Sequence, residues 1–209
     1  WSRTRFTMDK EFSIAVIKVF VDLYNNKLIY KDKKLVNWDT QLQTAISDLE
    51  VIQKEVQSQL YYIDYQFENS PEKITIATTR PETMMGDTAV AVNPKDERYV
   101  NFVGKEVRIP IVNRTVKIIA DHYADPEQGS GAVKITPAHD FNDYEVGKRN
   151  KLEIINIFEK DGKINKSGIK EYVGLDRFEA RKILIKKLKE NGSLVKIETI
   201  KNKVPYGDR

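Results

Sequence analysis

The sequence has 209 residues, 40% of them hydrophobic and 32% charged, which suits a globular protein of one large domain or a domain with an appendage. It has no cysteine and only two histidines, His122 and His139, so disulfides and thiolate chemistry are excluded and we expect no structural metal. No apolar run approaches the roughly 18 residues of a membrane helix, and we expect no membrane span. The chain opens on Trp1 without a signal-peptide pattern, which predicts a piece of a longer protein.

The net charge of +4 is distributed unevenly. Residues 1–159 hold 21 basic and 24 acidic residues, a net −3, whereas residues 160–209 hold 14 and 7, a net +7. A basic C-terminal quarter can attract a phosphate backbone. A solvated lysine-rich face is the simpler interpretation of the same charge.

The N-terminal part shows packing signals and no catalytic pattern. Residues 10–28 repeat apolar side chains on a helical period, which predicts a packing helix with a broad apolar stripe. We expect a short extended element over residues 28–38. Within residues 37–51 we find no catalytic pattern, and Asp39, Asp48 and Glu50 are most simply solvated loop or cap residues.

Strand signals begin at Gln59, where polar and apolar residues alternate and β-branched and aromatic residues are frequent. The expected strands are 61–67, 74–79, 88–92, 106–112, 115–120, 132–136, 154–158 and 194–198. Most are separated by segments too short for a helical crossover, so we predict an antiparallel or mixed barrel, closed or partly closed. Two helices complete an α+β fold: 141–149, and 176–191 with a capping box of Asp176 and Glu179.

Residues 129–143 concentrate polar side chains between a predicted strand and a predicted helix. Strand alternation places Lys134 and Thr136 on one face. Asp140 occupies a helix N-cap position, and Asp143 occupies the position of the reciprocal capping acid. Both acids gain from the positive end of the helix dipole, so we expect both to stay ionised near neutrality and to bind an ammonium and a hydroxyl. A plain capping box is the simpler alternative.

A second polar cluster, T-T-R-P-E-T at residues 78–83, follows a predicted strand. Thr78 and Arg80 continue the alternation of that strand, and Pro81 keeps Arg80 extended. An extended arginine at a strand exit suits a phosphate or carboxylate ligand, although a structural ion pair is the simpler interpretation. We expect Arg80 to close the other side of a pocket formed with residues 129–143.

Two long strings carry a family resemblance: T-T-R-P-E-T-M-M-G-D-T-A-V-A-V-N-P-K-D-E-R-Y at 78–99 and G-S-G-A-V-K-I-T-P-A-H-D-F-N-D-Y-E-V-G at 129–147. They resemble the inserted editing domain of the valyl-tRNA synthetase family. Further strings extend the resemblance to nearly the whole chain: W-S-R-T-R-F-T-M-D, N-W-D-T-Q-L-Q-T-A-I-S-D-L-E-V and V-P-Y-G-D-R. Glu82 and Gly86-Asp87-Thr88 resemble the valine enzyme, whereas the sister isoleucine and leucine enzymes vary this segment.

The resemblance implies a β-barrel-rich editing domain of class I aminoacyl-tRNA synthetases over residues 58–209, after a helical and extended linker over residues 1–57. It implies a monomeric, cytoplasmic protein that hydrolyses threonine wrongly esterified to the terminal adenosine of valine tRNA, because a valine pocket cannot strongly reject this near-isostere. The H-I-G-H and K-M-S-K-S strings of aminoacylation are absent. We therefore expect no tRNA charging and no cofactor in this chain; ATP and magnesium belong to the catalytic core of the full-length family.

Carried over by position, the resemblance implies roles for eight residues and no metal ligand. They are catalytic Asp140, Lys134 and Thr136, and substrate-binding Asp143, Arg80, Thr78, Thr79 and Glu82. It implies that Asp140 binds the α-amino group, that Asp143 reads the threonine hydroxyl, and that Lys134, Thr136 and Arg80 hold the terminal adenosine and its backbone. The aromatic residue that stacks on adenine in the family is Gln128 here, so stacking must be weaker or come from elsewhere, such as Tyr123.

The expected chemistry is attack of a positioned water on the ester carbonyl, assisted by the free ribose hydroxyl and without a covalent enzyme intermediate. No G-x-S-x-G elbow is present, and His139 alternates away from Asp140, so a Ser-His-Asp triad is not expected. Two alternatives remain open. The chain could be a tRNA-binding or docking fragment with little catalysis, or the editing domain of the sister isoleucine enzyme.

Overall fold

The structure is a computed structural model that describes residues 4–207, and the chain forms two compact units, Trp1–Lys34 and Leu35–Arg209. The outermost ends of the resembling strings, residues 1–3 and 208–209, lie outside the described residues. The division predicted between residues 57 and 58 falls inside a continuous strand, β3 (Val51–Phe67). The compact units part earlier because the first half of β3 is already paired with the last strand of the sheet.

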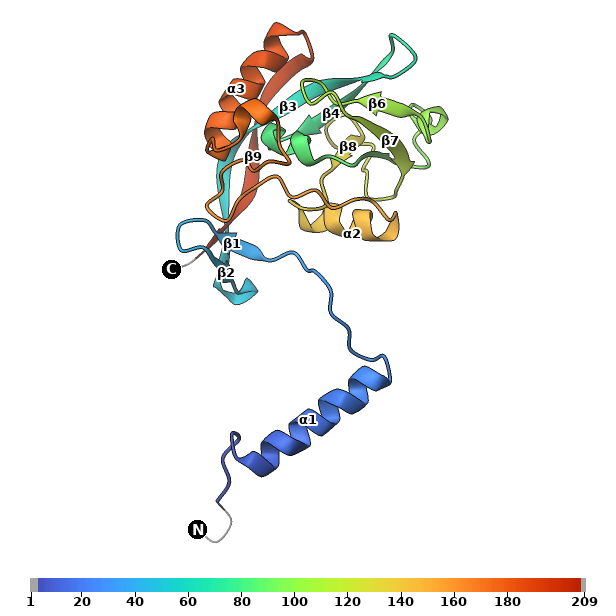
Figure 1. Ribbon diagram of the computed structural model, residues 1–209. Helices are drawn as coiled ribbons and strands as arrows, with labels where there is room; N and C mark the ends of the chain where they lie inside the picture. The colour runs from blue at the N-terminus through green and yellow to red at the C-terminus, as the bar shows by residue number, and fades with distance from the viewer. Residues whose placement is uncertain (1–3, 208–209) are drawn as a thin grey trace. The chain divides into compact units, whose positions relative to one another are not determined.

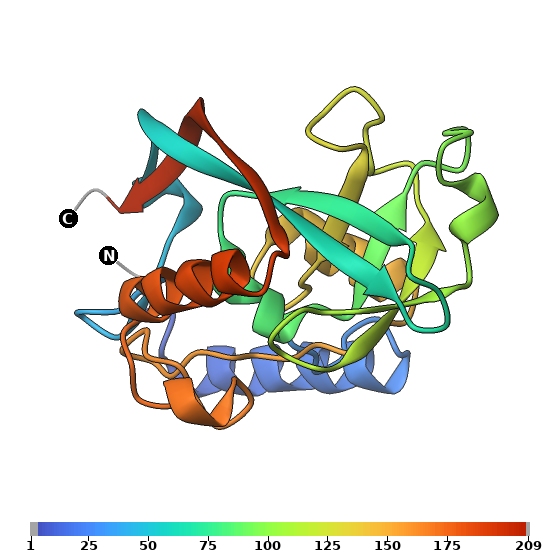
Figure 2. The same ribbon diagram turned by 90° about the horizontal axis from the view of Figure 1, so that it is seen from above.

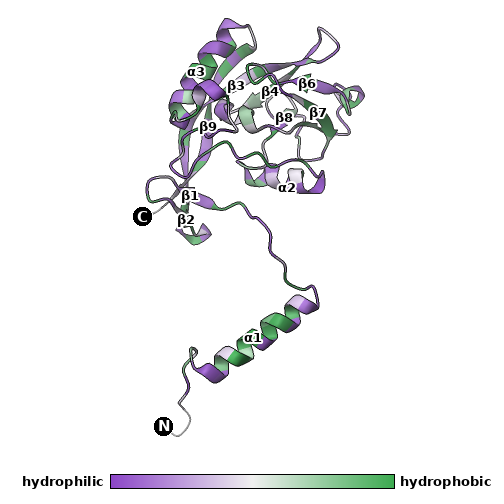
Figure 3. Ribbon diagram, in the orientation of Figure 1, coloured by the Kyte–Doolittle hydropathy of each residue, from purple (hydrophilic) through white to green (hydrophobic). Residues whose placement is uncertain are grey.

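The first unit is built around helix α1 (Lys10–Asn25). It confirms the helix predicted over residues 10–28 but ends earlier, at Asn25. Lys27, just beyond the helix, takes a left-handed backbone conformation with φ of 59°. Hydrophobic residues follow one another along much of the helix (Figure 3). None of its residues is buried within the described part of the chain.

The second unit opens with a short hairpin, β1 (Asn37–Asp39) and β2 (Thr44–Ile46), which the sequence analysis did not predict. A 3₁₀ turn, Asp48–Glu50, follows it with a capping box between Ser47 and Glu50. Glu50 is therefore a capping residue, which is one of the two roles, loop or cap, that were expected for it.

The main sheet has seven strands and curls into a half-barrel (Figure 1). The strands after β3 are β4 (Lys73–Thr78), β5 (Ala89–Val92), β6 (Glu106–Arg108), β7 (Thr115–Ala120), β8 (Ala132–Ile135) and β9 (Leu194–Gly207). Their order is β4-β3-β6-β7-β5-β8, with β9 also paired to β3, and all pairs are antiparallel except β5 with β7. The two ends of this path, β4 and β8, approach each other. The predicted mixed, partly closed barrel is thereby confirmed.

Four strand predictions need correction. The strand expected over residues 61–67 begins at Val51, because β9 pairs with its first half. The strand expected over residues 106–112 ends at Arg108, because Ile111 and Asn113 have left-handed backbones in the turn to β7. Residues 154–158 form no strand and contribute only a single bridge, from Phe158 to Ile164. The strand expected over 194–198 continues to Gly207, because β3 supplies a partner along its whole length.

Two helices cover the sheet. Helix α2 (Phe141–Arg149) packs Val146 into a small apolar cluster with Ala89, Ala91, Ala124 and Ile135. Helix α3 (Arg177–Glu190) lies alongside β9 (Figures 1 and 2) and buries Ala180, Leu184 and Leu188 in the main core. Asp176 caps α3 as predicted, but no capping box with Glu179 forms. Within residues 4–207, no helix is long and apolar enough to cross a membrane.

Candidate functional site

The first turn of α2 places two carboxylates at the end of β8. The Asp140 side chain caps the helix: its Oδ1 accepts from the N–H groups of Asn142 (2.8 Å) and Asp143 (3.1 Å). Asp140 is exposed to solvent. Both cap bonds end on Oδ1, so Oδ2 can accept a hydrogen bond from a ligand. The predicted N-cap is confirmed.

Asp143 differs from the prediction for a reciprocal capping acid. Its Oδ2 accepts from the N–H of Thr136 at 2.9 Å, so it fastens α2 to the end of the strand instead of the N-cap backbone. Only 5% of the residue is exposed. Burial raises the pKa of Asp143 to about 7; the Lys134 ammonium opposes this rise and the Asp140 carboxylate adds to it. The expectation that this acid is fully ionised near neutrality is therefore wrong, because sequence spacing does not show how deeply the helix turn is buried.

Asp87 is a buried hub that the sequence analysis did not single out as a site residue. Its Oδ1 accepts from Thr136 Oγ1 at 2.6 Å and from Lys134 Nζ at 3.2 Å, and its Oδ2 accepts from the Tyr65 hydroxyl at 2.7 Å. Lys134 and Thr136 also hydrogen-bond to each other. Burial raises the pKa of Asp87, and the Lys134 ammonium opposes that rise. A carboxylate between a glycine and an apolar strand was the signal that could have identified this hub.

Lys134 on β8 and Thr136 directly after it point to the same side, as strand alternation predicted. Both are buried and turned toward Asp87. Thr136 also joins the hub to the acid turn, because its N–H bonds to Asp143. The structure thus brings Asp87, Lys134 and Thr136 together in one hydrogen-bonded group that Thr136 links to Asp143. Direct contact of these residues with a ligand stays a prediction.

Arg80 lies beside the acid segment, although about sixty residues separate them. Its Nη1 donates to the backbone oxygen of His139 at 2.7 Å, and 44% of its side chain is exposed. Thr78 accepts from the Arg80 N–H at 3.1 Å and is buried, and Thr79 is half-buried directly after β4. The cluster predicted at residues 78–83 therefore meets the 129–143 segment with a guanidinium that can still reach an anion.

Glu82 has a partner that the sequence did not indicate. Its two carboxylate oxygens accept from Arg181 Nε at 2.6 Å and Nη2 at 2.7 Å, and Arg80 Nε lies 3.8 Å away. Glu82 is fully buried. Its carboxylate is thus engaged in a two-pronged ion pair with α3, which favours a supporting role over the predicted contact with substrate.

Replacing Arg181 with methionine is expected to lower the free energy of unfolding by roughly 2–4 kcal/mol, because it leaves the Glu82 carboxylate buried without its main partner. Urea unfolding measures this change. Lys182→Met, on the exposed side of the same helix, is the matched control and should unfold with the parent chain. Equal stability of the two variants would contradict the structural role of the pair.

The glycine turn before β8 also reaches the first cluster. A Cβ placed on Gly129, whose φ is +58°, would lie 2.8 Å from the Cβ of Ala77, so the turn lies directly over β4. Gln128 is exposed and its side-chain amide donates to Asp125 at 3.0 Å. No aromatic ring stands at that position, as the sequence already shows.

His139 is not placed to act as a general base together with Asp140. Its Nε2 accepts from the N–H of Ile157 at 3.0 Å. Burial lowers the pKa of His139 to about 3, with Arg80 and Lys134 adding to this effect. A neutral imidazole whose acceptor nitrogen is already used cannot take a proton from a serine or a water, so the geometry disfavours a triad.

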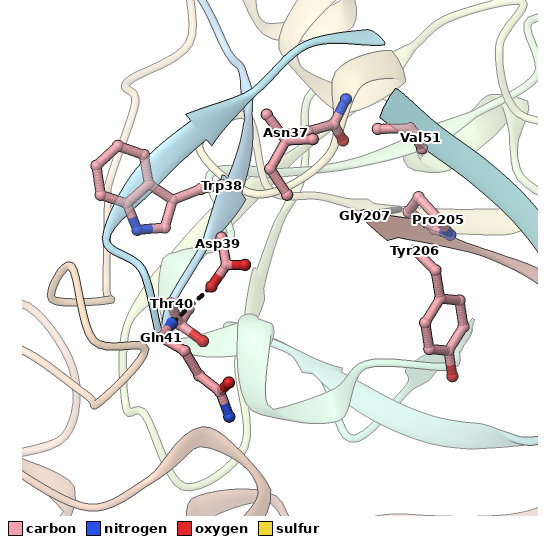
Figure 4. A pocket seen from close by; sticks show the side chains of 10 residues that line it. Asn37, Trp38, Asp39, Thr40, Gln41, Val51, Pro205, Tyr206 and Gly207 are labelled. Carbon is pink, nitrogen blue, oxygen red and sulfur yellow. Dashed lines mark hydrogen bonds between the residues drawn. The ribbon is translucent and has the colours of Figure 1, made fainter. Parts of the chain in front are cut away.

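Two hollows lie away from these residues. One, of about 360 Å³, lies between the β1–β2 hairpin and the end of β9 and includes Trp38 and Tyr206 (Figure 4). The other, of about 440 Å³, lies along residues 159–174 and is lined by three lysines. Neither includes a residue of the acid turn or the Asp87 hub. In the part of the chain that the structure describes, no group of three or more acids and histidines is placed to hold a metal ion.

Comparisons with known proteins identify the family. The family model for tRNA synthetases class I (I, L, M and V) matches residues 1–202. This chain belongs to the class I tRNA synthetases. It is 68% identical over 209 residues to the valine–tRNA ligase of Pelagibacter ubique and 55% identical over 209 residues to that of Lactococcus lactis, in each case 100% of this chain and 24% of the relative. The chain thus spans about a quarter of the length of these relatives.

Solved synthetase structures show the fold of this region. The ternary complex of agnB2 LeuRS from Agrobacterium radiobacter K84 with tRNA and LeuAMS aligns at a TM-score of 0.54 and 20% identity, over 94% of this chain and 33% of that one. The structure of GlLeuRS-CP1 aligns at a TM-score of 0.53 and 15% identity, over 66% of this chain and 99% of that one. The half-barrel described above therefore has the fold of GlLeuRS-CP1. The valine–tRNA ligase relatives confirm the resemblance to the valyl-tRNA synthetase family.

Proposed function

We propose that this chain hydrolyses the ester that joins threonine to the terminal adenosine of valine tRNA, as a monomer acting where translation takes place in the cytoplasm. The observation that carries the proposal is the pair of carboxylates on the first turn of α2, one exposed and one buried, beside a partly exposed arginine. The acids suit the ammonium and hydroxyl of a threonyl group, and Arg80 suits a phosphate. The valine–tRNA ligase relatives favour valine tRNA over isoleucine tRNA as the substrate.

The difference in burial between Asp143 and Asp140 favours a different substrate group for each acid. Asp143 is the more desolvated, and a buried carboxylate that is partly protonated gains most from a cation, because pairing offsets its desolvation. We therefore assign the α-ammonium group to Asp143 and the threonine hydroxyl to Asp140, whose Oδ2 takes part in neither cap bond. This assignment reverses the roles implied by the family resemblance. A methyl group in place of the hydroxyl would leave Asp140 without its donor.

Hydrolysis proceeds by attack of a water on the ester carbonyl, with the adjacent free ribose hydroxyl assisting proton transfer. The bond between the carbonyl carbon and the ribose oxygen breaks, and threonine and intact tRNA leave. His139 is held neutral with its acceptor nitrogen occupied, which speaks against an acyl-enzyme route through a histidine base. Covalent trapping of threonine on the chain would contradict this mechanism.

The test is release of threonine from threonylated valine tRNA by this chain. Asp140→Ala is expected to lower kcat/KM by about 100-fold, whereas Asp176→Ala should leave it unchanged. The two variants are matched because both residues cap a helix through side-chain bonds to backbone N–H groups, each worth about 1 kcal/mol of stability. Equal loss in both variants would show that capping alone matters.

A second candidate is a tRNA-docking fragment with little catalysis, and the net charge of +7 over residues 160–209 favours it. The same assay separates the two. Release of threonine by the unaltered chain supports the deacylase, and tRNA binding without release supports the docking fragment.

A further inference from the structure

The backbone of Arg80 is fixed on both sides. Its N–H donates to Thr78 Oγ1 at 3.1 Å, and its carbonyl oxygen accepts from the N–H of Thr83 at 3.0 Å and from the Thr83 hydroxyl at 2.8 Å. The residue after it, Pro81, opens a 3₁₀ turn, Pro81–Gly86, that is buried throughout. Only the side chain of Arg80 is therefore left to be oriented by its surroundings.

Two contacts orient the Arg80 guanidinium. Nη1 donates to the backbone oxygen of His139 at 2.7 Å, directly before the first acid, and Nε lies 3.8 Å from Oε1 of Glu82. Neither contact uses Nη2, and the side chain is partly exposed. The guanidinium thus keeps donors for an anion that approaches the first turn of α2.

The carboxylate of Glu82 is held by a second arginine, on α3. Arg181 donates from Nε to Oε2 at 2.6 Å and from Nη2 to Oε1 at 2.7 Å, and Glu82 is fully buried. Oε1 therefore lies near both arginines, but only Arg181 reaches it at hydrogen-bond distance. Because the two-pronged pair neutralises Glu82, the remaining positive charge of the three groups resides on the more exposed arginine, Arg80.

We propose that Arg181 is a positioning residue: by occupying Glu82, it keeps the Arg80 guanidinium turned toward the acids of α2 and available to a phosphate of the tRNA. The inference rests on the proposed function and adds how α3 controls that site. Without Arg181, the buried Glu82 carboxylate is uncompensated, and a second guanidinium is only 3.8 Å away. Closing that gap would pair Arg80 with Glu82, draw it from the His139 oxygen and neutralise the charge that a phosphate needs.

The test measures the affinity of the chain for uncharged valine tRNA as a function of salt concentration. Arg181→Met is expected to weaken binding about tenfold and to lower the slope of log affinity against log salt by about 0.7, the share of one phosphate contact on a single strand. Lys182→Met removes one exposed positive charge from the same helix and is the matched control, which should change neither quantity. Equal effects of the two substitutions would overturn the proposal, because net charge alone would then explain the loss.

A second substitution separates the positioning of Arg80 from the stability of the chain. When Glu82→Gln is added to Arg181→Met, no carboxylate remains to capture Arg80, so affinity and salt slope should return toward those of the parent. This double variant also decides the question if Arg181→Met alone does not fold. A loss of affinity that persists in the folded double variant would overturn the proposal and would show that Arg181 contacts the tRNA itself.

Kinetics separates this inference from the proposed function. If the unaltered chain releases threonine from threonylated valine tRNA, Arg181→Met should raise KM about tenfold and leave kcat unchanged, because a phosphate contact remote from the ester is lost from ground state and transition state alike. A fall in kcat with unchanged KM would overturn the proposal. If the unaltered chain binds tRNA but releases no threonine, the proposed function fails, whereas the affinities still decide the role of Arg181. If it binds no tRNA, both fail.

Discussion

Replacing Asp143 with asparagine is expected to lower kcat/KM for threonyl-tRNA by about 100-fold and, at pH 8, to make the chain more stable. The loss of activity follows from removing the charge that binds the substrate ammonium. Asparagine can still accept the N–H of Thr136, so the attachment of α2 to the strand is kept. A variant that is both inactive and more stable separates a functional acid from a structural one.

The sign of the stability effect follows from the raised pKa. Folding moves the pKa of Asp143 from 3.8 to about 7, so the folded chain binds more protons than the unfolded chain between these values. Stability therefore falls as the pH rises from about 4 to 7, and the full cost remains above that range. Asparagine carries no such cost.

Urea unfolding at pH 4 and pH 8 measures the difference. The variant is expected to gain on the order of 1–3 kcal/mol at pH 8 and nothing at pH 4. Glu145→Gln, on the exposed side of the same helix, is the matched control. A variant that is less stable than the parent at pH 8 would show that the Asp143 carboxylate is stabilised by its surroundings, against this account.

Replacing Asp87 with alanine is expected to have the largest effect on stability, a loss of about 3–5 kcal/mol. The substitution leaves the Lys134 ammonium buried without its carboxylate and removes the acceptor of the Tyr65 hydroxyl. Urea unfolding measures the loss. Asp161→Ala, which breaks an exposed ion pair with Lys163, is the control and should unfold with the parent chain.

A second substitution tests whether the unpaired ammonium is the cause. Adding Lys134→Met to Asp87→Ala removes the buried charge, and part of the lost stability should return. If the double variant is no more stable than Asp87→Ala alone, the hub acts through packing and not through charge pairing. The coupling energy between the two substitutions would then carry no information about charge pairing at the site.

Local patterns predicted the elements that depend on neighbours in sequence. The hairpin of β3 and β4, the cap at Asp140 and the cap at Asp176 all rest on residues within a few positions of each other. The full length of β9 was missed because its partner strand begins nearly 150 residues earlier, and an exposed polar strand has little signal of its own. The predicted strand at 154–158 failed because an apolar run does not reveal whether a neighbouring strand is available.

The candidate site shows the same limit. Its two acids could be found because a strand end and a helix cap are adjacent in sequence. The partner of Glu82 is Arg181, 99 residues away, and no local pattern connects them. The raised pKa of Asp143 depends on burial, which only the folded chain defines.

A crystal structure of this chain with a non-hydrolysable threonyl-adenosine analogue would show directly whether the two acids bind the amino acid. We expect the analogue at the first turn of α2, with its ammonium within hydrogen-bond distance of Asp143 and its side-chain hydroxyl at Asp140. Binding in the hollow beside Trp38 and Tyr206, or with the ammonium away from Asp143, would contradict this expectation.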